Sequence, residues 1–388
     1  MRSREQIARS AAAAVRDALG TLGTRHAMVG FDGFIDVIIR VVDRRRSMAY
    51  DDYESIRTID AFARRIAAAA GKSANLELVT LEQRFGGNGP LLAGALGRLG
   101  LSVAYVGAVG RDDEPCMLHP IYEPFAARCR EVVPVAPPSV TEALEFDDGK
   151  LMLGHARNAT FIDWERIKET VGLDRLRTLA AEASLIGIVN WTMVGGVEGI
   201  WSGLCNEVLK PGSDQRIFID LSDPAKRSDE DLGRGLGVLA SMAGFGRVTL
   251  GLNLAEAQRV AQVLGLERNE LAAGSFADDD AIGRAIAIRA ALSIECVVVH
   301  RRDGAAAASR CGSALWFDGP FTRNPVLSTG AGDHFNGGFA LGQVLNLDLP
   351  ECLAIACATS GLYVREAASP TAERVAAFLE ALPLPETE

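Results

Sequence analysis

The sequence has no paired cysteines, no long apolar run and no excess of positive charge. Its 7 cysteines are scattered without a Cys-x-x-Cys pair, which favours reduced thiols over disulfides or a zinc site. The most apolar internal stretch, residues 185–194, is too short to span a bilayer, which needs about 20 apolar residues. A net charge of −10 gives no general attraction to nucleic acid or to an anionic membrane. We therefore expect a cytoplasmic protein whose partners are small molecules, with no nucleic-acid or membrane partner.

Signals for export and for dinucleotide binding are also missing. The first 20 residues carry arginines and alanines but no leucine-rich core, so they predict an amphipathic helix and not a signal peptide. No Gly-x-Gly-x-x-Gly follows the first expected strand, which argues against a nicotinamide-dependent dehydrogenase. Without repeats or a Pro-rich linker, the simplest organisation is a helical extension, residues 1–26, and one domain, residues 27–388.

Short apolar segments alternate with helical patterns through most of this domain. This rhythm predicts a parallel sheet covered by helices on both faces. The segment near 139–157 alternates in the manner of a hairpin with an Asp-Asp-Gly-Lys turn, and the segments near 36–45 and 75–85 could join it. We expect these three segments to form a small β lid at the carboxyl edge of the sheet. The expected sheet strands lie within residues 27–42, 102–110, 183–191, 216–224, 246–253 and 294–302.

A Gly-rich turn leads into a helical pattern at STGAGDHFNGGFALGQVL, residues 328–345. The backbone N–H groups of Gly330, Ala331 and Gly332 would lie at a helix start, which favours a bound phosphate. Asp333, in the same turn, is placed to accept a proton from an alcohol that attacks the phosphoryl group. The alternative is that Asp333 only caps the helix and the glycines only form the turn.

Two earlier motifs suit a polyol. In FGGNGPLLAGALGRLG, residues 85–100, Gly86 and Gly87 allow a ligand to approach the backbone, and Asn88 offers both donors and acceptors to hydroxyl groups. In GFDGFID, residues 30–36, the carboxylates of Asp32 and Asp36 could accept hydrogen bonds from neighbouring hydroxyls. Turn formation is the alternative for the glycines and for Asp32.

Two further segments are candidates for the nucleotide site. Asn253 and Glu256 form an Asn-x-x-Glu pattern after an expected strand, which suits magnesium binding through water but is also close to a helix capping box. In VVVHRRDGAAAA, residues 297–308, His300 ends a strand and Arg302 could reach a phosphate. Solvated surface charge is the alternative for the arginine.

In their order along the chain, these motifs resemble the ribokinase-like (PfkB) carbohydrate kinases. Residues 328–335 match the signature DTxGAGDxF of that family in the GAGD core and Phe335, with Leu327 where the family has Asp. Residues 85–100 resemble its GGNxxNxAxxLxxLG segment, and Asn253 with Glu256 matches its NxxE motif. At residues 300–305 His300 and Arg302 replace the Thr and first Gly of its TxGxxG motif. The resemblance covers residues 27–381.

The resemblance implies an α/β fold of three layers, α/β/α, with a mainly parallel central sheet and a small β lid. It implies a sugar kinase that transfers the γ-phosphoryl of ATP to a carbohydrate hydroxyl, with Asp333 as general base and the Gly330–Asp333 turn as anion hole. Asp32, Asp36, Gly86, Gly87 and Asn88 would bind the sugar. Mg2+ would be held through water by Asn253 and Glu256, a monovalent cation is a further candidate, and a homodimer would form through the lid. His300, Arg302 and Thr329 would join Asn253 and Glu256 at the nucleotide. The alternatives are a nucleoside kinase of the same superfamily and a catalytically silent sugar-binding protein.

Overall fold

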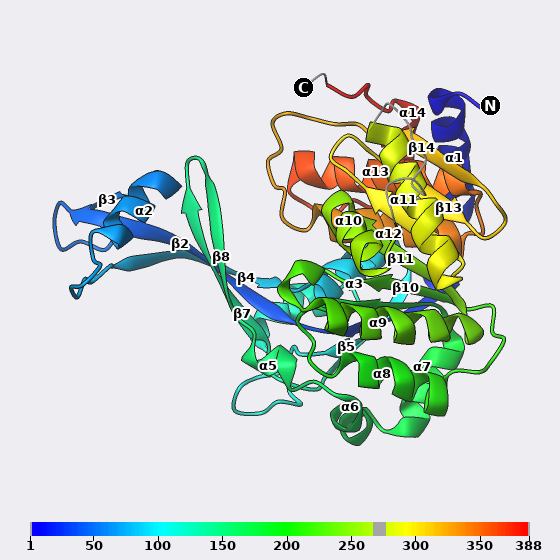
Figure 1. Ribbon diagram of the computed structural model, residues 1–388, viewed down its shortest axis with the longest axis horizontal. Coiled ribbons are helices and arrows are strands. Elements are labelled where there is room, and N and C mark those ends of the chain that lie inside the picture. Colours follow the sequence, from blue (N-terminus) through cyan, green and yellow to red (C-terminus); the bar gives the residue numbers. More distant parts are fainter. Residues whose placement is uncertain (1, 267–276, 387–388) are drawn as a thin grey trace.

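The central element of the fold is a mainly parallel sheet. A computed structural model describes residues 2–266 and 277–386; residue 1 of the expected extension, and residues 267–276 and 387–388 of the expected domain, lie outside the described part. The strand order is β14-β13-β12-β11-β10-β9-β1-β5-β6 (Figure 1). Neighbouring strands from β6 to β12 are parallel, whereas β13 and β14 are antiparallel. The strands are β1 (His26–Phe31), β5 (Ser102–Gly107), β6 (Glu131–Pro134), β9 (Ala183–Val189), β10 (Arg216–Asp220), β11 (Arg247–Asn253), β12 (Cys296–His300), β13 (Gly304–Ser309) and β14 (Ala314–Asp318).

Helices cover both faces of this sheet, because its strands are apolar on both sides and must be buried on both. One apolar core holds residues of α6 to α11, and the other holds residues of α1, α3 and α12 to α14. The three-layer α/β/α fold expected from the sequence is therefore confirmed. The first face carries α6 (Trp164–Val171), α7 (Leu173–Glu182), α8 (Val197–Gly203), α9 (Asp229–Ser241), α10 (Leu254–Val263) and α11 (Ala277–Leu292); the second carries α1 (Arg4–Ala18), α3 (Asn88–Arg98), α12 (Ala331–Val344), α13 (Leu349–Glu366) and α14 (Ala372–Glu380).

A second sheet projects from the main body (Figure 1). Four of its strands follow the order β3-β2-β7-β8. The fifth strand, β4, lies outside this order and pairs with β2. A small core that includes Ile39, Phe62 and Phe146 lies between α2 and these strands. The elements are β2 (Phe34–Arg45), β3 (Tyr53–Ser55), α2 (Ile59–Ala67), β4 (Leu78–Gly86), β7 (Ser139–Phe146) and β8 (Gly149–His155); the short helices α4 (Glu123–Ala126) and α5 (Arg157–Thr160) complete the fold.

Two local expectations needed correction. Residues 53–70 have helical spacing without breakers, which predicts one helix, but they begin with the edge strand β3 and only α2 within them is helical. The pair β13 and β14 was not expected, because four alanines and a glycine in β13 do not give a strand pattern; the buried surface of α11 and α13 selects it. Among the described helices, none is long and apolar enough to cross a membrane.

Candidate active site

The polar residues of the expected motifs gather at the carboxyl edge of the main sheet. Asp32 and Asn190 follow the ends of β1 and β9, Asp220 ends β10, and Asn253 and His300 end β11 and β12. Parallel strands bring their carboxyl ends to one edge, so residues far apart in sequence meet there. The site is built from this edge, from the amino ends of α3 and α12, and from the second sheet.

The amino end of α12 carries the GAGD turn. Gly330 is the N-cap with φ of 88°, a left-handed conformation that glycine adopts without steric cost. A Cβ at this position would also come within 3.0 Å of the Tyr363 hydroxyl. Among the described backbone groups, the N–H of Ala331 donates to Ser328 O, whereas the N–H of Gly332 has no backbone acceptor. Gly332 therefore presents an open donor at the positive end of the helix.

Asp333 lies in the first turn of α12 and is only 6% exposed. The side-chain amide of Asn88 donates to its Oδ1 at 3.0 Å. Burial raises the pKa of Asp333 well above the usual aspartate value, and the neighbouring Asp220 carboxylate raises it further. The Asn88 hydrogen bond works in the opposite direction because it stabilises the charged form. A carboxyl whose pKa is moved toward neutrality suits general-base chemistry.

Asp32 is fully buried and lies behind Asn88, not in a cavity. Its carboxylate accepts from the N–H of Asn88 at 3.0 Å, from the N–H of Gly89 at 2.7 Å and from Asn190 Nδ2 at 2.6 Å. Burial raises its pKa to about 6, against the lowering effect of these donors. These bonds give Asp32 a structural role, because its carboxylate holds the start of α3; its contact with a sugar stays a prediction.

Asp36 on β2 lines a cavity together with Gly87 and Asn88. Burial raises its pKa, and the positive charges of Arg84 and Lys150 partly offset this. Gly86 packs against this carboxylate, since a Cβ at residue 86 would lie 2.5 Å from Asp36 Oδ2. Gly86 therefore makes room for Asp36 and lines neither cavity, whereas Gly87, Asn88 and Asp36 are exposed to the space that a ligand would fill.

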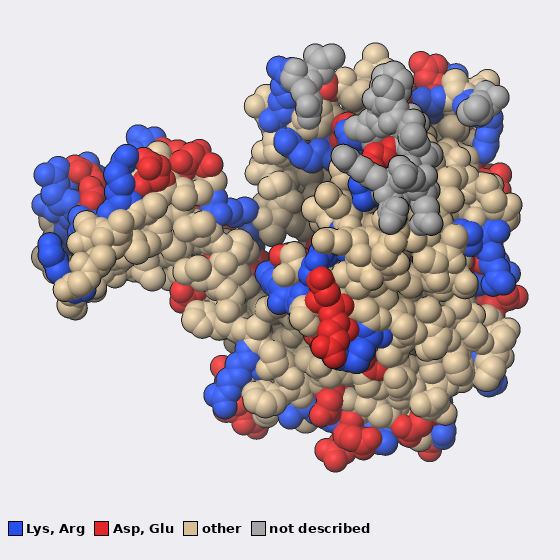
Figure 2. Space-filling model, viewed as in Figure 1, with Lys and Arg blue, Asp and Glu red and all other residues tan. Residues whose placement is uncertain are grey.

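Two cavities meet at the amino end of α12. The first, of about 550 Å³, lies between α13, the loop after β12 and the loop after β14. The second, of about 480 Å³, lies between the main body and the second sheet, where Figure 2 shows a recess. Asn253, His300 and Gly332 line both cavities, whereas Asp333 lines only the second. We call the first the donor cavity and the second the acceptor cavity.

Asn253 and Glu256 make the capping box that was the alternative interpretation of their spacing. Glu256 N–H donates to Asn253 Oδ1 at 2.9 Å, and Asn253 N–H donates to Glu256 Oε2 at 2.8 Å. Both residues also line the acceptor cavity, together with Asp220 and Asp223. Burial, and then the charge of Asp220, raise the pKa of Glu256 to about 9. The capping bond does not exclude Glu256 from cation binding, because one carboxylate has several acceptor positions.

The described residues contain no cluster of 3 or more His, Cys, Asp or Glu side chains with the geometry of a metal centre. Mg2+ commonly retains several waters and binds through one or two carboxylates and the phosphates of its substrate. Asp220, Glu256 and Asp333 crowd negative charge into one cavity, and a hydrated cation would relieve it. Asn253 and Glu256, which line this cavity, fit Mg2+ held through water and do not form a dedicated cage.

The loop after β12 contributes to the donor cavity. His300 lines it, and burial lowers the pKa of its imidazole to about 4, so the ring is neutral. The ring lies against Phe335, with centroids 5.0 Å apart. Arg302 also lines this cavity, and its guanidinium lies over the Phe321 ring at 5.3 Å.

Thr329 and Leu327 lie elsewhere than the resemblance implied. Thr329 lines the acceptor cavity and not the donor cavity, and its hydroxyl accepts from Lys150 Nζ at 2.6 Å. Leu327 lines neither cavity, and its N–H donates to Val364 O at 3.2 Å. The carboxylate that the family has at this position is absent here.

Several cavity residues were missed from the sequence. Asn190, Thr192, Asp220, Ser222 and Lys226 line the acceptor cavity. They follow β9 and β10, and the available signal was a polar residue directly after each buried strand.

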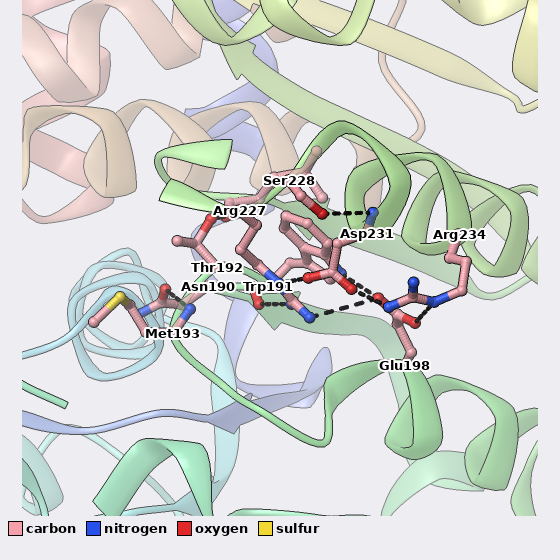
Figure 3. Close-up of polar contacts among 10 residues, drawn as sticks. Asn190, Trp191, Thr192, Met193, Glu198, Arg227, Ser228, Asp231 and Arg234 are labelled. Carbon is pink, nitrogen blue, oxygen red and sulfur yellow. Dashed lines mark hydrogen bonds and ion pairs between the residues drawn. The ribbon is translucent and has the colours of Figure 1, made fainter. Parts of the chain in front are cut away.

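A cluster of side chains outside the cavity joins the loops that carry these residues. Arg227 lies over the Trp191 ring at 3.9 Å and donates to Trp191 O at 2.9 Å (Figure 3). Asp231 and Glu198 pair with the same guanidinium. This cluster joins the loop after β9 to the start of α9 and so supports one wall of the acceptor cavity.

The two cavities and the buried Asp333 carboxylate thus meet at a glycine-rich helix start on a three-layer α/β/α fold. Solved structures share this fold. A ribokinase from Cryptococcus neoformans in complex with ADP has a TM-score of 0.60 and 16% identity, covering 90% of this chain and 98% of its own. A putative ribokinase II from E. coli, in complex with ATP and Mg2+, has a TM-score of 0.54 and 14% identity, covering 92% and 99%.

The chain belongs to the prokaryotic ketohexokinase family. The model of that family, described as prokaryotic ketohexokinase, matches residues 4–382. A ketohexokinase of Haloferax volcanii is 32% identical over 357 residues, which cover 90% of each chain. The expectation of a carbohydrate kinase with a ribokinase-like fold is confirmed.

Proposed function

We propose that this protein transfers the γ-phosphoryl group of ATP to a hydroxyl of a ketohexose. The observation that carries the proposal is the junction of the two cavities at Gly332, with Asp333 facing the acceptor side. The ketohexose is supported by the family match and by the Haloferax volcanii relative. ATP is supported by the complexes of structural neighbours with ADP and with ATP and Mg2+.

Asp333 would act as the general base. Its position beside Gly332 puts a proton acceptor and a phosphate-binding amide within one helical turn. As the acceptor oxygen attacks the γ-phosphorus, its proton passes to Asp333, and the bond from the γ-phosphorus to the β-γ bridging oxygen breaks to release ADP. The amino end of α12, from Gly330 through Ala331 and Gly332, would stabilise the charge that develops on the transferring group.

The sugar would lie between Asp36 and Asn88. Asp36 comes from the second sheet and Asn88 from the start of α3, so the two residues face the acceptor cavity from different sides. Asn88 already uses one N–H on Asp333 and its carbonyl oxygen on Ser222, so its remaining N–H and lone pair are available to a hydroxyl. Its hydrogen bond would align the base with the bound sugar.

Asn253 and Glu256 would hold Mg2+ through water at the triphosphate. Bound Mg2+ would neutralise phosphate charge, as it does in other phosphotransferases. His300 and Arg302 would contact the nucleotide from the donor cavity, with the neutral imidazole acting as a hydrogen-bonding group and Arg302 as a cation. A monovalent cation stays a prediction, and Leu327 supplies no carboxylate for it.

The second sheet would act as a lid. Lys150, at the start of β8, reaches Thr329 beside the GAGD turn, and Asp36, Thr141 and Met152 of this sheet line the acceptor cavity. Closure would exclude water, which otherwise competes with the sugar as phosphoryl acceptor.

We also propose a homodimer through the lid. Leu78, Leu81, Met152 and Leu153 are 45–52% exposed on this sheet. In Figure 2 the charged side chains of the projecting sheet gather along its upper and outer edges, and its middle and lower part is largely uncharged. Sedimentation velocity tests this proposal directly. A dimer that dissociates in Leu81→Glu supports it, and a wild-type monomer at micromolar concentration rejects it.

The test of the proposed activity is ADP release with ATP and Mg2+ on ketohexoses, aldohexoses and nucleosides. Turnover with a ketohexose and none with adenosine or inosine would support the proposal. Turnover restricted to nucleosides would favour the nucleoside kinase, and ligand-induced thermal stabilisation without turnover would favour a silent sugar-binding protein.

A further inference from the structure

Ser222 lies where the loop after β10 approaches the base, in a conformation unusual for its residue type. Its φ is 62°, in the left-handed region, which costs a non-glycine residue roughly 1 kcal/mol. Its N–H donates to Asp220 Oδ1 at 2.6 Å. Neighbouring backbone is also fixed, since Asn190 N–H donates to Asp220 O at 2.9 Å and Thr192 N–H donates to Leu221 O at 3.1 Å. Figure 3 shows Asn190 and Thr192 on the loop that makes these bonds.

This conformation directs the Ser222 hydroxyl to Asn88. Ser222 Oγ donates to Asn88 Oδ1 at 2.9 Å, and Asn88 Nδ2 donates to Asp333 Oδ1 at 3.0 Å. An ionised carboxylate only accepts hydrogen bonds, so the amide nitrogen must face Asp333. The Ser222 hydroxyl occupies the amide oxygen on the other side and so fixes the amide in this orientation.

We propose that Ser222 is a positioning residue that acts through Asn88 to hold the Asp333 carboxylate in its reactive orientation. The inference rests on the proposed role of Asp333 as general base. It goes beyond that role because it assigns a part in the reaction to a loop that matches none of the motifs found in the sequence.

The charged groups around Asp333 decide the expected pH effect. Asp220 and Asp32 raise its pKa, while Asp333 in turn raises the pKa of Glu256 and of Tyr363. The hydrogen bond from Asn88 opposes these effects by stabilising the carboxylate. If the Ser222 hydroxyl is lost, Asn88 is free to turn, this stabilisation weakens and the Asp333 pKa rises. The acidic limb of kcat should then move to higher pH.

The test compares Ser222→Gly with Ser222→Ala. Both remove the hydroxyl, but glycine adopts φ of 62° without steric cost, whereas alanine keeps the Cβ and therefore the backbone strain of serine. We expect both variants to lower kcat by roughly 10-fold to 100-fold and to shift its acidic limb upward by about half a pH unit or more. The matched control is Ser293→Gly, because Ser293 has φ of 54° but lies between α11 and β12, away from the site. Its kcat and pH profile should equal those of the wild type.

Three results would overturn the inference. A raised KM with unchanged kcat and pH profile would make Ser222 a direct sugar contact. If Ser222→Gly has the kcat and pH profile of the wild type and only Ser222→Ala loses activity, backbone strain alone explains the effect, and the hydroxyl has no role. Finally, Asp333→Asn separates the inference from the proposed function. Turnover retained in Asp333→Asn rejects Asp333 as the base. Turnover lost in Asp333→Asn, together with an unchanged acidic limb of kcat in Ser222→Gly, rejects only the role of Ser222.

Discussion

Replacement of Asp333 by asparagine removes the proton acceptor while preserving the size of the side chain. The new amide can present its oxygen to Asn88 Nδ2, so the 3.0 Å hydrogen bond is kept. A general base contributes about 10² to 10⁴ in rate, and with about 1.36 kcal/mol for each tenfold this loss corresponds to about 2.7–5.4 kcal/mol of activation free energy. The KM for the sugar should change little, because Asp36 and Asn88 remain in the acceptor cavity.

Folding should not suffer in this variant. Burial and the Asp220 charge raise the pKa of Asp333, so the folded wild type loses stability as pH rises from the ordinary aspartate pKa through the raised one. Asp333→Asn lacks this loss, and its melting temperature at neutral pH should equal or exceed that of the wild type. The assay is ADP release with saturating ATP, Mg2+ and ketohexose, beside thermal unfolding of both proteins. Turnover within about threefold of the wild type would refute the role of Asp333 as base.

Three further predictions follow from the site. Because a base must be ionised and the pKa of Asp333 is raised, kcat should fall with decreasing pH at values well above about 4, the range of ordinary aspartates; an acidic limb at about 4 would contradict this. Glu256→Gln keeps an acceptor for the capping bond from Asn253 but cannot ionise when a cation binds, so half-maximal activity should need roughly 10-fold more Mg2+ at fixed ATP; an unchanged Mg2+ titration would exclude Glu256 from the cation site. Arg227→Lys loses the stacking on Trp191 and should lower the free energy of unfolding by about 1–3 kcal/mol in a urea titration. As its control, Arg16→Lys at an exposed ion pair should cost less than about 0.5 kcal/mol.

The sequence predicted the layers of the fold because its strands are short, apolar and separated by helical patterns. The sheet strand expected within residues 27–42 is present as β1, and β2 of the second sheet follows it after Asp32 and Gly33. The edge strands of the two sheets were harder to predict from the sequence. β3 pairs with β2, and β14 with β13, which are close in sequence, but β13 also packs against the distant helix α13, and local propensity does not decide such edges.

The candidate site was predicted best where one motif holds all its parts. The GAGD turn places Gly332 and Asp333 in one helical turn, so their proximity follows from sequence alone. Asp32 was harder to interpret, because only the fold shows that Asn88, Gly89 and Asn190 use its oxygens.

The remaining site residues depend on the sheet order, which no local pattern contains. Asp220 and Ser222 were missed because they reach the site only through the place of β10 beside β9 and β11. Thr329 was assigned to the nucleotide, but the second sheet brings Lys150 to it on the acceptor side.

The most direct test of the proposed function is ATP-dependent, Mg2+-dependent ADP release with a ketohexose beside the aldohexose of the same configuration at C3 to C5. The structure and the family match predict turnover that strongly prefers the ketohexose and is lost in Asp333→Asn. Equal turnover of the two sugars would reject ketohexose specificity. Absence of turnover with either sugar, from folded protein that the ketohexose stabilises against heat, would contradict the assignment as a ketohexose kinase.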